Sequence, residues 1–183
     1  IPSGMSSKGF SMTTQDITFE SGEHALAGTL TVPRSNTPVP AAVLVSGSGP
    51  IDRDSNMKRA RLGVMQQVAD HLAGHGIASL RYDKRGIGAS EGHYKATGFH
   101  DNVDDARAAL AALRTRPEVD PESVFVVGHS EGALIAIELA ADTEQPLAGA
   151  VLLAGAAQPG KAILRWQAEQ IAGTQSQPAA MYQ

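Results

Sequence analysis

A short segment of the chain places one serine between two glycines, in the order Gly128-His129-Ser130-Glu131-Gly132. The valine-rich run at 124–127 predicts a buried strand before this segment, and residues 131–141 place apolar side chains at helical spacing after it. Ser130 is therefore expected at a tight strand-to-helix corner, where neighbours without side chains leave room for the backbone. A serine held at such a corner is presented as a nucleophile for acyl transfer, and the alternative is a purely structural turn.

A second glycine-rich turn could stabilise the negative charge that such a reaction develops. The apolar run at 41–45 predicts a strand that ends in Ser46-Gly47-Ser48-Gly49-Pro50. A tetrahedral acyl intermediate needs two fixed N–H donors about 3 Å from its oxyanion. We expect these donors to be the backbone N–H of Glu131 and that of Ser48 or Gly49. The alternative is a flexible connector of serine and glycine.

A third loop, from Arg81 to Gly92, crowds charged residues and glycines at the end of a predicted strand. We expect Asp83 and Arg85 to pair locally and to hold the shape of this turn, rather than to take part in catalysis. The loop lacks the third glycine of a dinucleotide fingerprint and the Gly-Lys-Ser/Thr of a nucleotide-binding loop. A phosphate site is therefore not expected here.

The composition is that of one soluble globular domain. The chain has 183 residues, of which 42% are hydrophobic and 19% are charged, with a formal net charge of −4. No basic run is interleaved with aromatic residues, and no apolar run is long enough to span a bilayer, so neither nucleic acid nor a membrane is an expected partner. The chain has no cysteine, and no metal site is expected. The absence of cysteine fits several compartments, and the cytoplasm is favoured over export.

The order of predicted elements indicates the fold class. Two alternating stretches separated by Ser21-Gly22-Glu23 predict an antiparallel hairpin, and strands then alternate with amphipathic helices. This order predicts a doubly wound α/β domain with a mostly parallel sheet and an N-terminal antiparallel hairpin. The expected hairpin strands are 16–21 and 24–33, the later strands 77–82, 123–127 and 148–154, and the helices 57–74, 100–116 and 131–141.

The two ends of the chain are expected to differ from its centre. Residues 1–15 are expected to be disordered or introduced in cloning, residues 16–159 to form the core, and residues 160–183 to start a cap or connecting helix with a frayed end. A helix in this last part carries the apolar residues Ile163, Leu164, Trp166 and Ile171. We expect it to cover part of the core, rather than Trp166 to line a substrate site.

Three motifs in this order resemble a known family. The turn SGSGP, the later DKRGIGAS and the corner GHSEG are together similar to the α/β-hydrolase superfamily. The longer string SGSGPIDRDSN narrows the resemblance to bacterial esterases and to relatives of the serine aminopeptidases and acyl-CoA thioester hydrolases, over about Asp16 to Pro159. The resemblance implies that Ser130 attacks an ester, thioester or amide carbonyl, that a histidine oriented by Asp or Glu takes its proton, and that no cofactor is needed.

The chain departs from this family in its histidines. In the family the acid and then the histidine follow the serine, whereas all six histidines here, at positions 24, 71, 75, 93, 100 and 129, precede Ser130. His93 and His100 are expected to be solvated loop residues. The catalytic histidine and acid cannot be identified in this chain, and we expect them, with the last strands of the fold, in a C-terminal part that it does not contain.

The function expected from these residues is hydrolysis of a carboxylic ester of a small molecule through an acyl-enzyme on Ser130. The alternatives are a thioesterase or aminopeptidase of the same fold, or an inactive fragment or binding domain. The segment 148–156 is apolar at consecutive positions, which is typical of an interior strand. We expect it to pair with a missing C-terminal segment or with a second copy in a homodimer.

Overall fold

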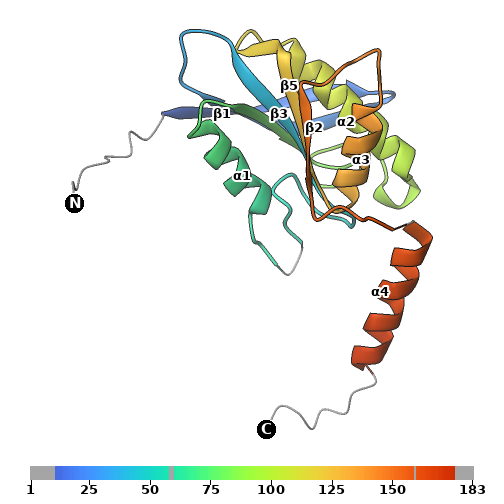
Figure 1. Ribbon diagram of the computed structural model, residues 1–183. Helices are drawn as coiled ribbons and strands as arrows, with labels where there is room; N and C mark the ends of the chain where they lie inside the picture. The colour runs from blue at the N-terminus through green and yellow to red at the C-terminus, as the bar shows by residue number, and fades with distance from the viewer. Residues whose placement is uncertain (1–10, 58–59, 159, 176–183) are drawn as a thin grey trace, which may run out of the picture.

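The computed structural model describes residues 11–57, 60–158 and 160–175. Six strands form one sheet in the order β1-β2-β4-β3-β5-β6 (Figure 1). The pairs β1–β2 and β2–β4 are antiparallel and the remaining three are parallel, so the predicted mixed sheet with an N-terminal hairpin is confirmed. The strands are β1 (Met12–Ser21), β2 (His24–Pro33), β3 (Val39–Val45), β4 (Ala78–Tyr82), β5 (Val119–His129) and β6 (Gly149–Leu153).

Helices cover both faces of this sheet. Helix α1 packs on one face, while α2 and α3 pack on the other, which is the doubly wound arrangement. A short 3-10 turn, η1, precedes α2, and α4 follows β6. The bounds are α1 (Val64–Ala73), η1 (Tyr94–Ala96), α2 (Phe99–Arg114), α3 (Glu131–Ala140) and α4 (Gly160–Gln175).

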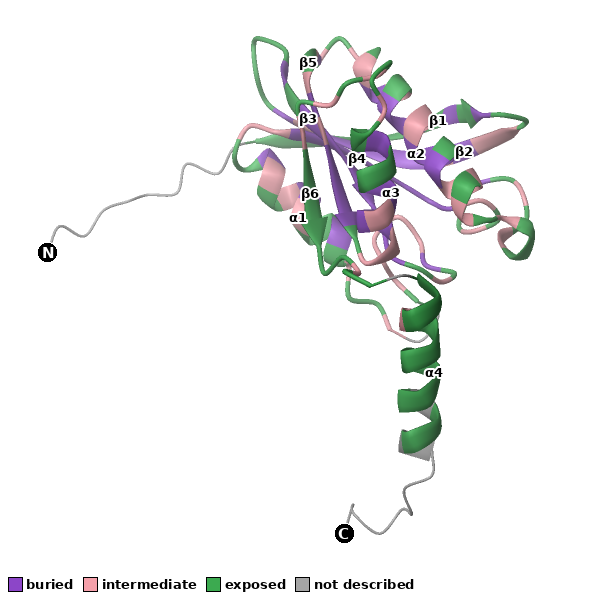
Figure 2. Ribbon diagram, turned by 45° about the vertical axis from the view of Figure 1, so that its right-hand side comes forward, coloured by how far each residue is buried: buried purple, intermediate pink, exposed green. Residues whose placement is uncertain are grey.

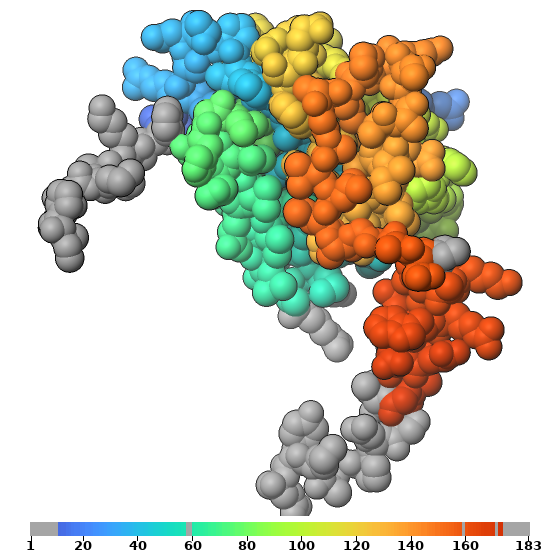
Figure 3. All heavy atoms as spheres, viewed as in Figure 1, coloured from blue at the N-terminus to red at the C-terminus, as the bar shows by residue number. Residues whose placement is uncertain are grey.

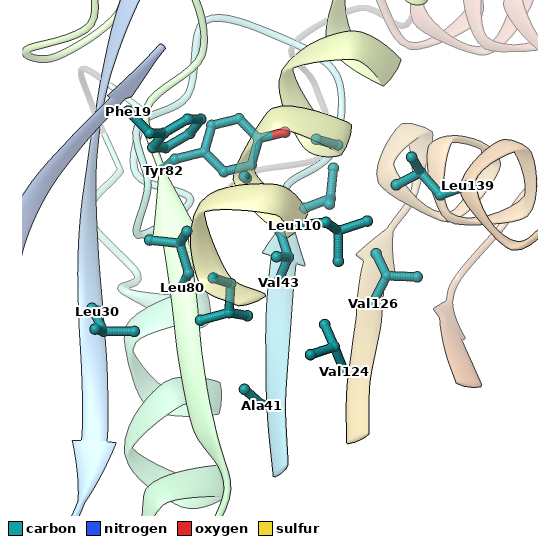
Figure 4. Close-up of a cluster of buried hydrophobic side chains, with 14 of the residues drawn as sticks. Phe19, Leu30, Ala41, Val43, Leu80, Tyr82, Leu110, Val124, Val126 and Leu139 are labelled. Carbon is teal, nitrogen blue, oxygen red and sulfur yellow. The ribbon is translucent and has the colours of Figure 1, made fainter. Parts of the chain in front are cut away.

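The central strands are buried on both faces, and alternate residues therefore belong to different cores. On β3, Val43 and Val45 face α2 and α3, whereas Ala42 and Leu44 face α1. Figure 4 shows the larger core, where side chains of β3, β4 and β5 meet Leu110 of α2. The buried sheet fixes the carboxyl ends of β3, β4 and β5, from which the candidate site is built.

Several element boundaries differ from those that the sequence predicts. Strand β1 begins at Met12 rather than Asp16, because its pairing with β2 continues to Met12 opposite Pro33. The expectation of a disordered end at residues 1–15 is therefore wrong for 12–15, and for 1–10 it lies outside the described residues. Strand β5 begins at Val119 rather than Ser123, because Val119 pairs with β3 across a register shift.

The first helix begins at Val64, and the prediction of a helix from Met57 is wrong. The preceding loop is held in a non-helical form by Asp52, whose carboxylate accepts hydrogen bonds from the backbone N–H groups of Asp54 and Asn56 at 3.0 and 2.8 Å. The Asn56 side chain then accepts the N–H of Gly63, which stands before the helix at φ 58°. Local polar contacts therefore delay the helix.

The last helix does not cover the core, and that prediction is also wrong. Helix α4 projects from the body of the molecule (Figures 2 and 3), and the side chains described in it are exposed except for that of Ile163, which is half-buried. Leu164 is 69% exposed and Trp166 is 60% exposed. Strand β6 is exposed as well and forms one edge of the described sheet, so its pairing with another segment or a second copy stays a prediction.

Candidate active site

Ser130 lies at the junction of β5 and α3 in a strained backbone conformation. Its φ and ψ angles are 55° and −115°, a region that L-residues rarely adopt. Two backbone hydrogen bonds stabilise this conformation. The Ser130 N–H donates to Leu153 O at 2.9 Å, and Ser130 O accepts the N–H of Ala133 at 3.0 Å. The side chain is partly exposed, and its hydroxyl has no hydrogen bond within the described chain.

The two flanking glycines are required by close packing at this corner. A Cβ on Gly128 would overlap the carbonyl oxygen of Gly132, and a Cβ on Gly132 would overlap that of Val45. Strand β3, strand β5 and helix α3 therefore approach one another through backbone alone. His129, between them, is exposed.

The turn after β3 lies directly beside Ser130. A Cβ on the buried Gly47 would lie 3.1 Å from Ser130 Cβ and 3.3 Å from His129 Nδ1. The N–H groups of Ser48, Gly49 and Glu131 have no hydrogen-bond acceptor among the residues that the structure describes. These groups are thus free to bind an anion, and the N–H of Glu131 stands at the start of α3, where the helix dipole favours negative charge.

A cavity of about 390 Å³ opens beside Ser130. Its polar lining includes Ser48, Ser130 and Glu131, and most of the remaining wall is apolar. No sequence signal marks the apolar part of this wall as a site, although the i, i+4 spacing of the lining residues Ile163 and Gln167 places these two on one helical face. The apolar lining residues are Phe99, Leu134, Ala156, Ile163 and Leu164. Trp166 is not among the lining residues.

The charged loop after β4 is ordered by other partners than the sequence predicts. Asp83 and Arg85 do not pair with each other: Asp83 binds Arg53 at 2.7 Å, and Arg85 binds Asp105 at 2.8 Å. Gly88 has φ 58° and lies against the Asp83 carboxylate, where a side chain would overlap it. The predicted local pair of Asp83 with Arg85 is therefore wrong, and each of the two residues contacts a distant segment instead.

Asp83 connects three segments near the site. Its carboxylate accepts hydrogen bonds from the Arg53 guanidinium, the Arg53 backbone N–H and the Ala89 backbone N–H. Burial alone would raise the pKa of Asp83, but these hydrogen bonds and the Arg53 charge outweigh burial and lower that pKa below its ordinary value. Arg53 belongs to the string IDRDSN, and no local sequence signal indicates this role for it.

None of the six histidines, all of which lie within the described ranges, forms a hydrogen bond with Ser130. His93 and His100 are both exposed, as expected, but His100 lies in the first turn of α2 rather than in a loop. In the described part of the chain no group of three or more His, Cys, Asp or Glu residues could hold a metal ion, and no helix has the length and apolar character to cross a membrane.

Comparison with known proteins decides the family. The family model described as serine aminopeptidase, S33, matches residues 60–181, well over half of the chain and including the Ser130 corner. The chain belongs to the serine aminopeptidase S33 family. This S33 chain is also 33% identical to esterase EstD from Thermotoga maritima over 144 residues, which cover 79% of the chain and 34% of EstD.

Solved structures support the same fold for the S33 chain. It superposes on the α/β-hydrolase GrgF from Penicillium sp. sh18 with a TM-score of 0.68 at 22% identity, covering 88% of this chain and 53% of GrgF. The Pyrococcus furiosus esterase Pf2001 gives a TM-score of 0.61 at 22% identity, and the match covers 81% of this chain and 55% of Pf2001. The chain spans about a third of the length of the curated relatives it matches.

Proposed function

We propose that Ser130 is the nucleophile of a hydrolase that cleaves carboxylic esters through an acyl-enzyme. The observation that carries this proposal is the Ser130 backbone, strained at φ 55° between two glycines that packing requires. In the first step Ser130 Oγ bonds to the ester carbonyl carbon and its proton passes to a base. The bond from this carbon to the alkoxy oxygen then breaks, and the base returns the proton to that oxygen, so that the alcohol leaves. Water then cleaves the acyl-serine bond and releases the acid.

The oxyanion of each tetrahedral intermediate would accept hydrogen bonds from Glu131 N–H and from the turn after β3. The position of Gly47 beside Ser130 favours Ser48 N–H over Gly49 N–H as the second donor. Neither N–H group has an acceptor among the described residues, and preorganised donors of this kind account for a large part of the rate enhancement in acyl transfer.

The cavity supports an apolar acyl group and argues against two alternatives. An aminopeptidase needs a free carboxylate for the substrate's ammonium group, but the only carboxylate among the described lining residues, Glu131, is paired with Lys84 at 3.1 Å. A thioesterase that acts on acyl-CoA needs cations for the phosphates, and no Lys or Arg is among the described lining residues. The lining that this part of the protein contributes is therefore suited to a neutral ester with an apolar acyl chain.

The test compares three substrates on the complete translation product, namely p-nitrophenyl butyrate, butyryl-CoA and alanine p-nitroanilide. We expect the highest kcat/KM for the ester and a loss of at least about 1000-fold in Ser130→Ala. A variant that keeps the parent rate would refute Ser130 as nucleophile. Preference for the thioester or the anilide would shift the assignment to a thioesterase or an aminopeptidase, and absence of turnover with all three would favour a binding domain.

A further inference from the structure

Lys84 is a buried lysine that connects the two sides of the candidate oxyanion site. Its side chain is 6% exposed. Its Nζ donates to the carbonyl oxygen of Gly47 at 2.7 Å and to Glu131 Oε1 at 3.1 Å. One ammonium group from the loop after β4 thus contacts the turn after β3 and the first residue of α3.

The contact with Gly47 O acts on the N–H of Ser48, because both belong to one peptide group. The described chain contains no cis peptide, so this carbonyl and this N–H point in opposite directions. A cation fixed at the oxygen therefore fixes the direction of the N–H. It also polarises the amide and makes the N–H a stronger donor.

The contact with Glu131 acts on the second donor. The carboxylate belongs to the residue whose N–H would bind the oxyanion, and the side chain also lines the cavity. An unpaired carboxylate there would repel a developing negative charge. The Lys84 ammonium neutralises it, and Asn102 Nδ2 lies 3.5 Å from the same Oε1.

We propose that Lys84 is the positioning residue of the oxyanion hole. A single buried ammonium orients the Ser48 N–H through Gly47 O and offsets the charge of Glu131. Lys84 itself does not touch the substrate. This inference rests on the proposed hydrolase function and extends it to a residue outside the nucleophile corner.

Steady-state kinetics on the complete translation product test this role with p-nitrophenyl butyrate. In Lys84→Met we expect kcat to fall by about 100-fold, as for loss of one oxyanion donor, with KM changed by less than about threefold. Lys84→Arg keeps the charge and should retain kcat within about tenfold. The matched control is Lys95→Met, which removes the same charge from an exposed position and should keep the parent kcat.

The effect on kcat of a second substitution, at Glu131, distinguishes a positioning role of Lys84 from a merely structural ion pair. Adding Glu131→Gln to Lys84→Met removes the unpaired carboxylate and should restore kcat by at least about tenfold, whereas a structural pair predicts no such gain. A kcat within threefold of the parent in Lys84→Met, or no recovery in the double variant, would overturn the proposal.

A second measurement does not depend on catalysis. Backbone ¹⁵N relaxation of the complete translation product should give Ser48 an order parameter of about 0.85, falling below about 0.6 in Lys84→Met, with Gly22 in the β1–β2 turn unchanged. An unchanged Ser48 value would overturn the positioning role. If Ser130→Ala keeps full activity, the proposed nucleophile fails, and the relaxation result still decides separately whether Lys84 orders the turn.

Discussion

Asp83 accepts two hydrogen bonds from Arg53, one from the backbone N–H at 2.8 Å and one from the guanidinium at 2.7 Å. The carboxylate is 4% exposed and follows β4, whereas Arg53 lies in the loop that begins at the Ser48 turn. The pair therefore attaches the candidate oxyanion loop to the centre of the sheet. Arg53 also donates to Thr29 Oγ1 at 2.9 Å, which extends the attachment to β2.

Replacing Asp83 by Asn should lower the free energy of unfolding by about 3 kcal/mol at pH 7, because it leaves the Arg53 guanidinium without its buried counter-charge. Urea unfolding of parent and variant measures this difference. Asp104→Asn is the matched control, since the Asp104 side chain is 63% exposed and its pair with Arg107 should contribute less than about 1 kcal/mol.

The same pair predicts a pH dependence of stability. The pKa of Asp83 is lowered in the folded state, so its contribution is complete above the ordinary carboxyl pKa near 4 and is lost as the pH falls through the lowered folded value. The difference in the free energy of unfolding between the parent and Asp83→Asn should therefore become smaller as the pH is lowered below about 4. A difference that stays constant between pH 7 and pH 2 would contradict this account.

Replacing Gly128 by Ala should destabilise the fold by about 3 kcal/mol or more, because its Cβ would overlap the Gly132 carbonyl oxygen and backbone cannot easily shift there. Thermal unfolding followed by circular dichroism measures the effect. Gly173→Ala, in open space on α4, is the control and should leave stability equal or slightly higher. Equal unfolding temperatures for parent and Gly128→Ala would show that the corner is not packed as described.

The sequence predicts the elements with strong local signals and misses contacts between distant segments. The hairpin, the alternation of strands and helices, and the position of Ser130 between β5 and α3 follow from periodicity and glycine placement. The partners of Asp83 do not, because Arg53 is brought to it by the tertiary fold, and short sequence distance favoured Arg85 instead. Lys84 carries no local signal of its contacts either.

The end of the chain shows a different limit of sequence analysis. The apolar residues of α4 predict a helix that packs on the core. Amphipathic spacing, however, indicates only that one face of a helix is covered and does not identify the surface that covers it. In the structure Ile163 and Leu164 line the cavity beside Ser130 instead. Hydrophobic periodicity therefore predicted the helix but not its position.

Shortening Leu134 to Ala should lower the preference for butyrate over acetate esters by about threefold to tenfold, since the side chain forms part of the apolar cavity wall and contact with an added CH₂ contributes about 0.8 kcal/mol. The ratio of kcat/KM values for the two p-nitrophenyl esters measures the effect. Ile137→Ala, on the exposed side of the same helix, should leave the ratio unchanged. An unchanged ratio in Leu134→Ala would show that the acyl group does not bind in this cavity.

The exposed edge strand β6 predicts association of the 183-residue chain. Its outer residues Val151 and Leu152 are 46% and 48% exposed, and a long apolar edge favours pairing with another strand. Light scattering at high concentration should detect dimers, and Leu152→Lys should reduce them. A parent chain that stays monomeric at about 1 mM would contradict this prediction.

The most direct test of the central claim is covalent labelling of Ser130. The complete translation product is treated with a fluorophosphonate, and the modified peptide is identified by mass spectrometry. The account predicts one adduct, on Ser130, which is lost in Ser130→Ala and kept in the control Ser35→Ala, a serine in an exposed loop. Labelling at another residue, or an unchanged adduct in Ser130→Ala, would contradict it.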